Sequence, residues 1–122
     1  MTTYIVRIDG RLPGANEYIE ACRRNKYEAA KMKREAEELI GWYIMNLPPL
    51  KNPVHITFGW AEPNARRDYD NISFGRKFIL DAMQKYGKLM NDNRKSVVGF
   101  ADEFSVDPQN PHITLTIKEI GK

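Results

Sequence analysis

Hydrophobic and polar residues alternate along four stretches of the chain. Each stretch is rich in β-branched or aromatic residues and is bounded by Gly, Pro or polar residues. This alternation is typical of strands that are buried on one face and more exposed on the other. The pattern predicts four strands, over residues 3–9, 54–63, 96–107 and 112–120.

Two other stretches have the spacing of amphipathic helices. From 17 to 45, apolar residues recur at steps of three, four or seven, and Asn16 is a candidate N-cap. A break near Asn25 is compatible with this pattern. A second helix is predicted over 72–87, with Gly87 where a left-handed C-terminal cap belongs. The predicted apolar stripe of the first helix comprises Ile19, Cys22, Ala29, Met32, Ala36, Leu39 and Tyr43.

The order of these elements is β, α, β, α, β, β. It predicts an α+β fold, in which two helices cover one face of a four-stranded sheet. A chain of 122 residues suits a single domain over 1–122. Trp42 and Trp60 are both expected in the core.

Composition gives limited information about the cellular compartment of the protein. The chain has one cysteine, Cys22, so an internal disulfide is excluded and a reducing cytoplasm fits. No apolar run approaches the ~20 residues of a membrane span, and no secretory signal is visible at the N-terminus. We therefore expect a cytoplasmic protein with no membrane partner.

Charge is concentrated in the segment 66–95, which holds eight Lys or Arg residues and four Asp residues. This arrangement would suit a nuclease, in which basic side chains bind phosphates and acidic side chains bind a metal. However, a mixture of acidic and basic residues more often indicates a solvent-exposed helix face.

Asp68 and Asp70 lie one residue apart just before the second predicted helix. In extended chain both would project to the same side, with Tyr69 between them pointing into the core. Asp70 or Asn71 would make a good N-cap, which leaves Asp68 without a role. Two carboxylates about 5 Å apart repel by on the order of 3 kcal/mol at an effective dielectric of 20, and a divalent cation would offset this. Spacing alone leaves two candidates, Asp81 and Asp92, for a third acid.

The segments "RRDYDN", "KFILDAM" and "GKLMND" together resemble the RusA-like Holliday junction resolvases, small endonucleases of phages and prophages. The "LPGAN" loop, the helix after it, the strand before the motif and the final strand "ITLTI" match in order and length. The resemblance covers nearly the whole chain, and this ordered set is more specific than a lone D-x-D.

The resemblance implies that Asp68, Asp70 and Asp92 bind a divalent metal. It also implies a catalytic lysine at Lys77. This chain has three more residues than the family pattern between Asn71 and Lys77, so Arg76 is an alternative for that cation.

The implied function is Mg²⁺-dependent resolution of four-way DNA junctions by paired symmetric cuts, in recombination and repair. Mn²⁺ is an alternative cofactor. Two cuts favour a C2 homodimer, and the setting would be the cytoplasm of a bacterial host of a phage or prophage. Candidate contacts to the DNA backbone are Arg66, Arg67, Arg76, Lys88, Arg94 and Lys95.

Two other functions remain open from the sequence. One is a structure-selective DNA-binding module without catalysis, in which the acids only cap the helix. The other is a nuclease for other branched DNA, because the same acids would serve it.

Overall fold

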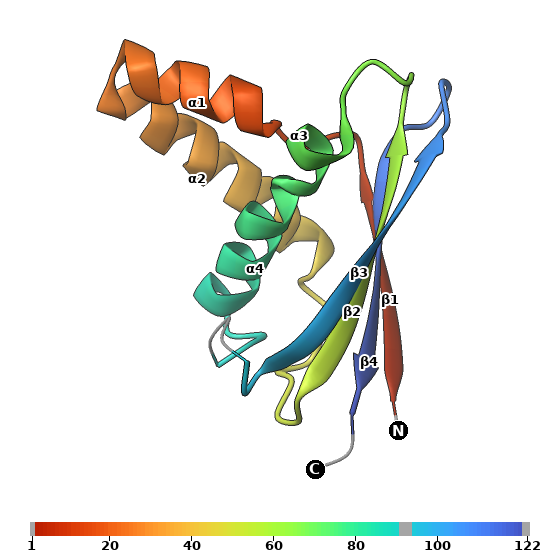
Figure 1. The fold of residues 1–122 in the computed structure, drawn as a ribbon. Helices are drawn as coiled ribbons and strands as arrows, with labels where there is room; N and C mark the ends of the chain where they lie inside the picture. Colours follow the sequence, from red (N-terminus) through yellow and green to blue (C-terminus); the bar gives the residue numbers. More distant parts are fainter. Residues whose placement is uncertain (1, 91–93, 121–122) are drawn as a thin grey trace.

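The computed structural model describes residues 2–90 and 94–120 and has an α+β fold (Figure 1). All of its helices lie on one face of a twisted four-stranded sheet, and the other face is uncovered. This confirms the predicted class and the one-sided arrangement. In chain order the elements are β1 (Thr3–Asp9), α1 (Ala15–Arg24), α2 (Lys26–Tyr43), β2 (Val54–Glu62), α3 (Tyr69–Ser73), α4 (Gly75–Lys85), β3 (Val97–Val106) and β4 (His112–Glu119).

Each predicted helix is two helices in the structure. The first divides at Asn25, whose side chain accepts a hydrogen bond from the Glu28 N–H at 2.9 Å and so caps α2. The second begins earlier than predicted and divides at Phe74 into the short α3 and the longer α4. The predicted count of two helices is therefore wrong for the described residues.

The strands follow the order β1-β4-β2-β3 in a mixed sheet. β4 pairs antiparallel with both β1 and β2, whereas β2 and β3 are parallel. The parallel pair requires a crossover, which α3 and α4 supply. β3 lies at an edge of the sheet, with its register placing Phe104 beside Trp60.

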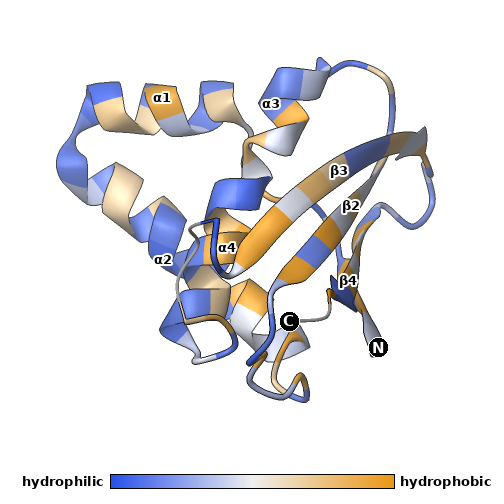
Figure 2. Cartoon of the chain, turned by 60° about the horizontal axis from the view of Figure 1, so that its bottom comes forward, coloured by the Kyte–Doolittle hydropathy of each residue, from blue (hydrophilic) through white to orange (hydrophobic). Residues whose placement is uncertain are grey.

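The core lies between the sheet and the helices. β2 contributes the fully buried Ile56 and Phe58, and Trp60 is 2% exposed. The edge strand β3 is less covered, with only Val97 buried, and Figure 2 shows its apolar and polar residues in groups rather than in strict alternation.

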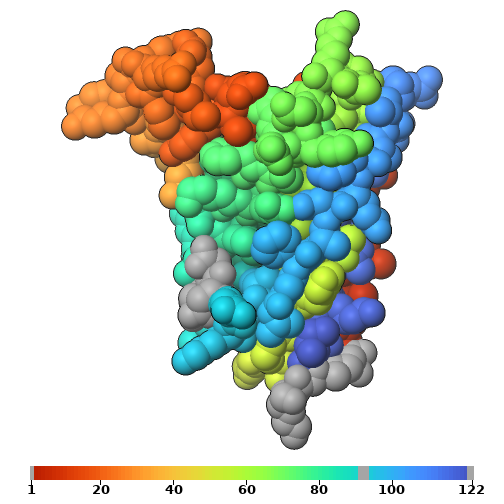
Figure 3. All heavy atoms as spheres, in the orientation of Figure 1, coloured from red at the N-terminus to blue at the C-terminus, as the bar shows by residue number. Residues whose placement is uncertain are grey.

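The predicted apolar stripe of the first helix is only partly right. Ala29 and Ala36 are buried, but Cys22 is exposed and Ile40 and Ile44 complete the inward face instead. The break at Asn25 gives α1 and α2 separate axes, so one stripe cannot continue across both. In the space-filling view α1 projects from the body of the molecule (Figure 3). Trp42 is 70% exposed, which corrects its predicted place in the core.

Gly87 has a φ of +75°, which confirms its predicted role at the end of the second helical segment. The Lys88 N–H reaches back to the Met83 carbonyl at 2.7 Å. None of the helices in the described part of the chain is long and apolar enough to cross a membrane.

Candidate active site

Asp68 begins α3. Its backbone is extended, and its Oδ1 accepts a hydrogen bond from the Asn71 N–H at 2.9 Å. Asp68 is thus the N-cap, a role that the sequence assigned to Asp70 or Asn71. The prediction was wrong by two or three residues because the helix starts at Tyr69 rather than at Ile72. The carboxylate stays exposed, and its second oxygen can still accept other ligands.

Asp70 lies in the first turn of α3 and is exposed. Within residues 2–90 and 94–120, no hydrogen bond or ion pair involves its carboxylate. Asp68 is extended while Asp70 is helical, so the alternation argument for their common direction does not apply. An acid in the first turn suits the helix dipole, but Asp70 has no capping bond to account for it.

Tyr69 does not point into the core as predicted. It is 67% exposed, and its ring stacks on Phe104 of β3 with 4.4 Å between the ring centroids. The buried residue of this short helix is Ile72. α3 is therefore held by Ile72 and by the ring contact, with both acids on the solvent side.

The "LPGAN" loop packs directly against α3. The Asn71 side-chain oxygen accepts a hydrogen bond from the Asn16 N–H at 2.9 Å. A Cβ at Gly14 would come within 2.4 Å of that same oxygen, so this close approach requires glycine. Gly14, rather than the predicted Asn16, is the N-cap residue of α1. The loop thus fixes the position of the segment that carries the acids.

The two arginines of the motif differ sharply. Arg67 donates to the Leu12 carbonyl at 3.1 Å and pairs with Glu17 and Glu62, leaving its side chain 15% exposed. Arg66 is exposed, and its guanidinium has no partner in the described ranges. Arg66 is therefore available to bind a phosphate, whereas the guanidinium of Arg67 is already engaged in contacts within the fold.

Arg76 is also held in place by its neighbours. It forms an ion pair with Asp102 of β3 and lies 4.4 Å from the Phe100 ring centroid. The second oxygen of Asp102 accepts from Trp60 Nε1 at 2.8 Å. This network joins α4 to the sheet.

Lys77 is more available, with a side chain that is 58% exposed. Its Nζ lies 3.7 Å from Asp81, and Lys33 of α2 lies 3.5 Å from the same carboxylate. Asp81 therefore sits between two lysines. Neither it nor any other residue forms a cluster of three potential metal ligands with Asp68 and Asp70 in the described part of the chain.

Asp92, the third acid implied by the resemblance, lies outside the described residues. The nearest described residues on either side, Met90 and Arg94, belong to the connection between the end of α4 at Lys85 and the start of β3 at Val97. The 11 residues of α4 correspond to about 16 Å of helix. The other predicted DNA contacts at this end are Lys88, Arg94 and Lys95. Arg94 and Lys95 are exposed, and Lys88 donates to the Met45 carbonyl at 3.3 Å.

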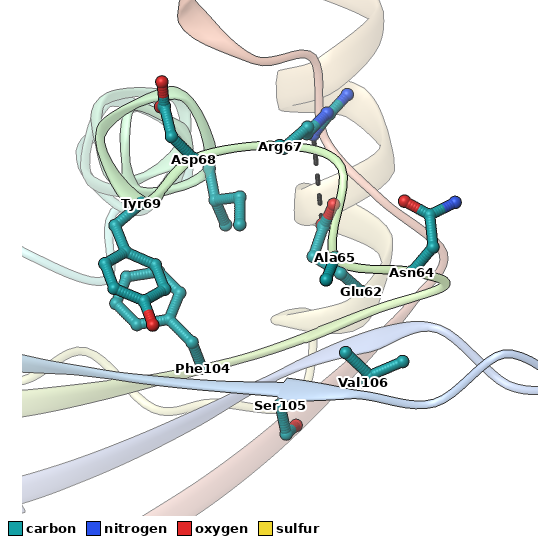
Figure 4. Close-up of a pocket in the computed structure, with 10 residues that line it drawn as sticks. Glu62, Asn64, Ala65, Arg67, Asp68, Tyr69, Phe104, Ser105 and Val106 are labelled. Atoms are coloured by element: carbon teal, nitrogen blue, oxygen red, sulfur yellow. Dashed lines mark ion pairs between the residues drawn. The ribbon is translucent and has the colours of Figure 1, made fainter.

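A pocket of about 410 Å³ opens beside Asp68, between the loop after β2 and the end of β3 (Figure 4). The pocket could not be predicted from the sequence, because it depends on the parallel pairing of β2 with β3. Its lining residues are Glu62, Asn64, Ala65, Arg67, Asp68, Tyr69, Ile72, Phe104, Ser105 and Val106.

At the back of this pocket Glu62 is only 6% exposed. Arg11 binds it at 2.8 Å, and Arg67 lies 3.9 Å away. Two guanidinium groups thus balance one buried carboxylate, as a buried charge requires. Glu62 is an acid that the sequence argument missed, and its contacts make it a structural one.

No protein-family model matches this chain, and no curated protein matches it.

Proposed function

We propose that the protein is a Mg²⁺-dependent endodeoxyribonuclease that resolves four-way DNA junctions by paired symmetric cuts. The observation that carries the proposal is the exposed carboxylate of Asp70, two residues after Asp68, which has no partner within residues 2–90 and 94–120. The resemblance of the surrounding motif to the RusA-like resolvases supplies the substrate class. The setting we propose is recombination and repair in the cytoplasm of a bacterial host.

The two acids fit a hard divalent cation. Mg²⁺ usually takes one or two carboxylates and completes its coordination with water and substrate phosphate. Asp70 offers both oxygens, and Asp68 offers the oxygen that the Asn71 N–H does not use. The bound ion, Mg²⁺ or Mn²⁺, would lower the pKa of a water molecule and neutralise charge that develops on the phosphate.

The cations of the chain would position the DNA. Arg66, exposed on the loop before the acids, would hold a backbone phosphate. Lys77 would stabilise the leaving oxygen as a point charge, once its pair with Asp81 opens. The Lys77 side chain is itself 58% exposed, and Lys33 would remain 3.5 Å from the Asp81 carboxylate after Lys77 leaves it.

A homodimer is part of the proposal. Asp68 and Asp70 lie at the start of the α3–α4 segment, and Asp92 follows its far end in the sequence. We propose that a site that uses all three acids draws Asp92 from a second copy of the chain. A two-fold dimer would also supply the two sites that symmetric cutting of a junction needs.

A second candidate function is structure-selective DNA binding without catalysis. It is favoured by the capping bond of Asp68, which gives this acid a structural role. This alternative predicts binding that weakens with salt but does not depend on Mg²⁺.

The test uses a labelled synthetic four-way junction and a linear duplex of matching sequence, each with Mg²⁺ or with EDTA. The proposal predicts paired nicks at symmetric positions on the junction alone, only with Mg²⁺, and none with Asp70→Asn. Junction binding should persist in that variant. Binding without metal-dependent cutting would reject the nuclease and leave the binding module, whereas nicks on flaps or forks but not on the four-way junction would change the substrate.

A further inference from the structure

A pair of stacked aromatic rings forms one wall of the pocket beside Asp68. In Figure 4 Tyr69 and Phe104 lie together at one side of the cavity, and Asn64 lies at the other. Tyr69 comes from α3 and Phe104 from β3, so the stack bridges two elements. The exposure of Tyr69 leaves much of its surface open to a ligand.

The other residues that line the pocket are partly apolar and partly polar. Val106, Ala65 and Ile72 supply aliphatic surface. The Asn64 side-chain oxygen accepts from the Arg66 N–H at 3.0 Å, which leaves the two amide protons of Asn64 as donors. Ser105 also lines the pocket, but its side chain points away from the cavity, on the other side of β3 from Phe104 and Val106 (Figure 4). A flat aromatic ligand with acceptor atoms on its edge would suit this combination.

Charge in and around the pocket favours a ligand attached to a phosphate. The buried Glu62 is balanced by Arg11 and Arg67, so the back wall presents a compensated ion pair. Arg66 is exposed on the adjacent loop without a partner in the described ranges, and it can hold an anion outside the pocket. A nucleotide has this division between a flat base and a charged backbone.

We infer that this pocket binds one unstacked nucleobase of the DNA strand at Asp68, with the base against the Tyr69–Phe104 pair. The inference rests on the proposed function for the identity of the strand. The volume of about 410 Å³ lies within the range of ~300–1,000 Å³ typical of small-ligand clefts. Aromatic side chains bind bases of any sequence in this way, because every base has a π-face.

The occupant would be a base released from its pair, as at a branch point or in a single strand. A base inside a duplex stack cannot reach a ring on the protein. The pocket would therefore favour open DNA over linear duplex without reading its sequence. Such a preference would place a distorted strand next to Asp68 and Asp70.

The test measures binding of two labelled strands in EDTA, which prevents cutting. One is a ten-nucleotide thymidine strand and the other an abasic strand of equal length, so the two share their backbone charge. The wild type should bind the thymidine strand about tenfold more tightly. Tyr69→Leu should reduce this ratio to about twofold, and Tyr69→Phe should keep it.

Two further variants separate the pocket from general surface effects. Val106→Trp, which places a large side chain in the cavity, should also reduce the ratio. Tyr27→Leu removes another exposed tyrosine, from α2, and should leave the ratio unchanged. The slope of affinity against salt concentration should be the same in all of these variants, because it reports phosphate contacts.

Equal binding of the two strands by the wild type, or binding of neither, would overturn the inference. So would an unchanged ratio in Tyr69→Leu, or an equal loss in Tyr27→Leu. The junction-cutting assay keeps this result separate from the proposed function. Cutting without a base preference rejects the pocket alone, and a base preference without cutting rejects the nuclease alone.

Discussion

Acidic side chains occur in two very different settings on the helical side of this sheet. Asp102 of β3 is largely covered, with one oxygen bound to the Trp60 indole and the other to Arg76. Asp68 and Asp70 at the start of α3 are exposed, and the only hydrogen bond of their carboxylates in the described part of the chain is the cap to the Asn71 N–H. The comparison shows that a charge can be essential to the fold or free for a ligand, and that its partners decide which.

Substitution of the covered acid, Asp102, should lower the stability of the fold. Removing Asp102 would leave the Trp60 N–H and the Arg76 guanidinium without their acceptor in a largely dry space. The free setting should tolerate substitution, because water replaces whatever an exposed carboxylate loses. Substitutions at Asp102 test the covered setting, and substitutions at Asp68 and Asp70 test the exposed one.

The largest loss of stability is expected for Asp102→Ala. We expect the free energy of unfolding to fall by about 2–3 kcal/mol, because a buried donor and a cation lose their partner together. Urea unfolding followed by tryptophan fluorescence measures this. Asp102→Asn keeps an acceptor for Trp60 and should lose about half as much; a loss below about 0.5 kcal/mol in Asp102→Ala would contradict the structural role of this acid.

A smaller effect separates the two exposed acids. Asp68→Ala removes the N-cap of α3 and should cost about 1 kcal/mol. Asp68→Asn keeps a capping oxygen and should lower the free energy of unfolding by only a few tenths of a kcal/mol. Asp70→Ala removes no side-chain hydrogen bond or ion pair within residues 2–90 and 94–120, so the same urea experiment should show a change below about 0.5 kcal/mol. If Asp70→Ala were the more damaging variant, the cap would have been assigned to the wrong residue.

Much of the fold could be predicted because local patterns determine it. Alternation located all four strands, and the positive φ of Gly87 follows from glycine at a helix end. The helix breaks were harder to predict, because Asn25 and Phe74 divide segments whose apolar periodicity is continuous. Trp42 illustrates another limit: it is apolar but 70% exposed, because it follows the buried Ile40 by two residues and so lies on the opposite side of α2.

The candidate site was less predictable than the fold. The motif located Asp68 and Asp70, but the cap, the helix start and the direction of Tyr69 depend on contacts with distant parts of the chain. Asn71 meets the loop at Asn16, and Tyr69 meets Phe104 on a strand far along the sequence. Nor could spacing reveal that Arg67 and Arg76 are held in ion pairs, whereas the Arg66 guanidinium has no partner within residues 2–90 and 94–120. Such pairings need the tertiary structure.

We propose above all that the exposed carboxylate of Asp70 serves phosphodiester cleavage rather than the fold. Its most direct test compares Mg²⁺-dependent junction cutting and urea unfolding in the wild type, Asp70→Asn and Asp9→Asn. Asp9 is a matched exposed aspartate whose surface pair with Arg7 is worth little. We predict that Asp70→Asn loses cutting by about 100-fold or more with unfolding unchanged, while Asp9→Asn keeps both. Undiminished cutting by Asp70→Asn, or no cutting by the wild type, would contradict the claim.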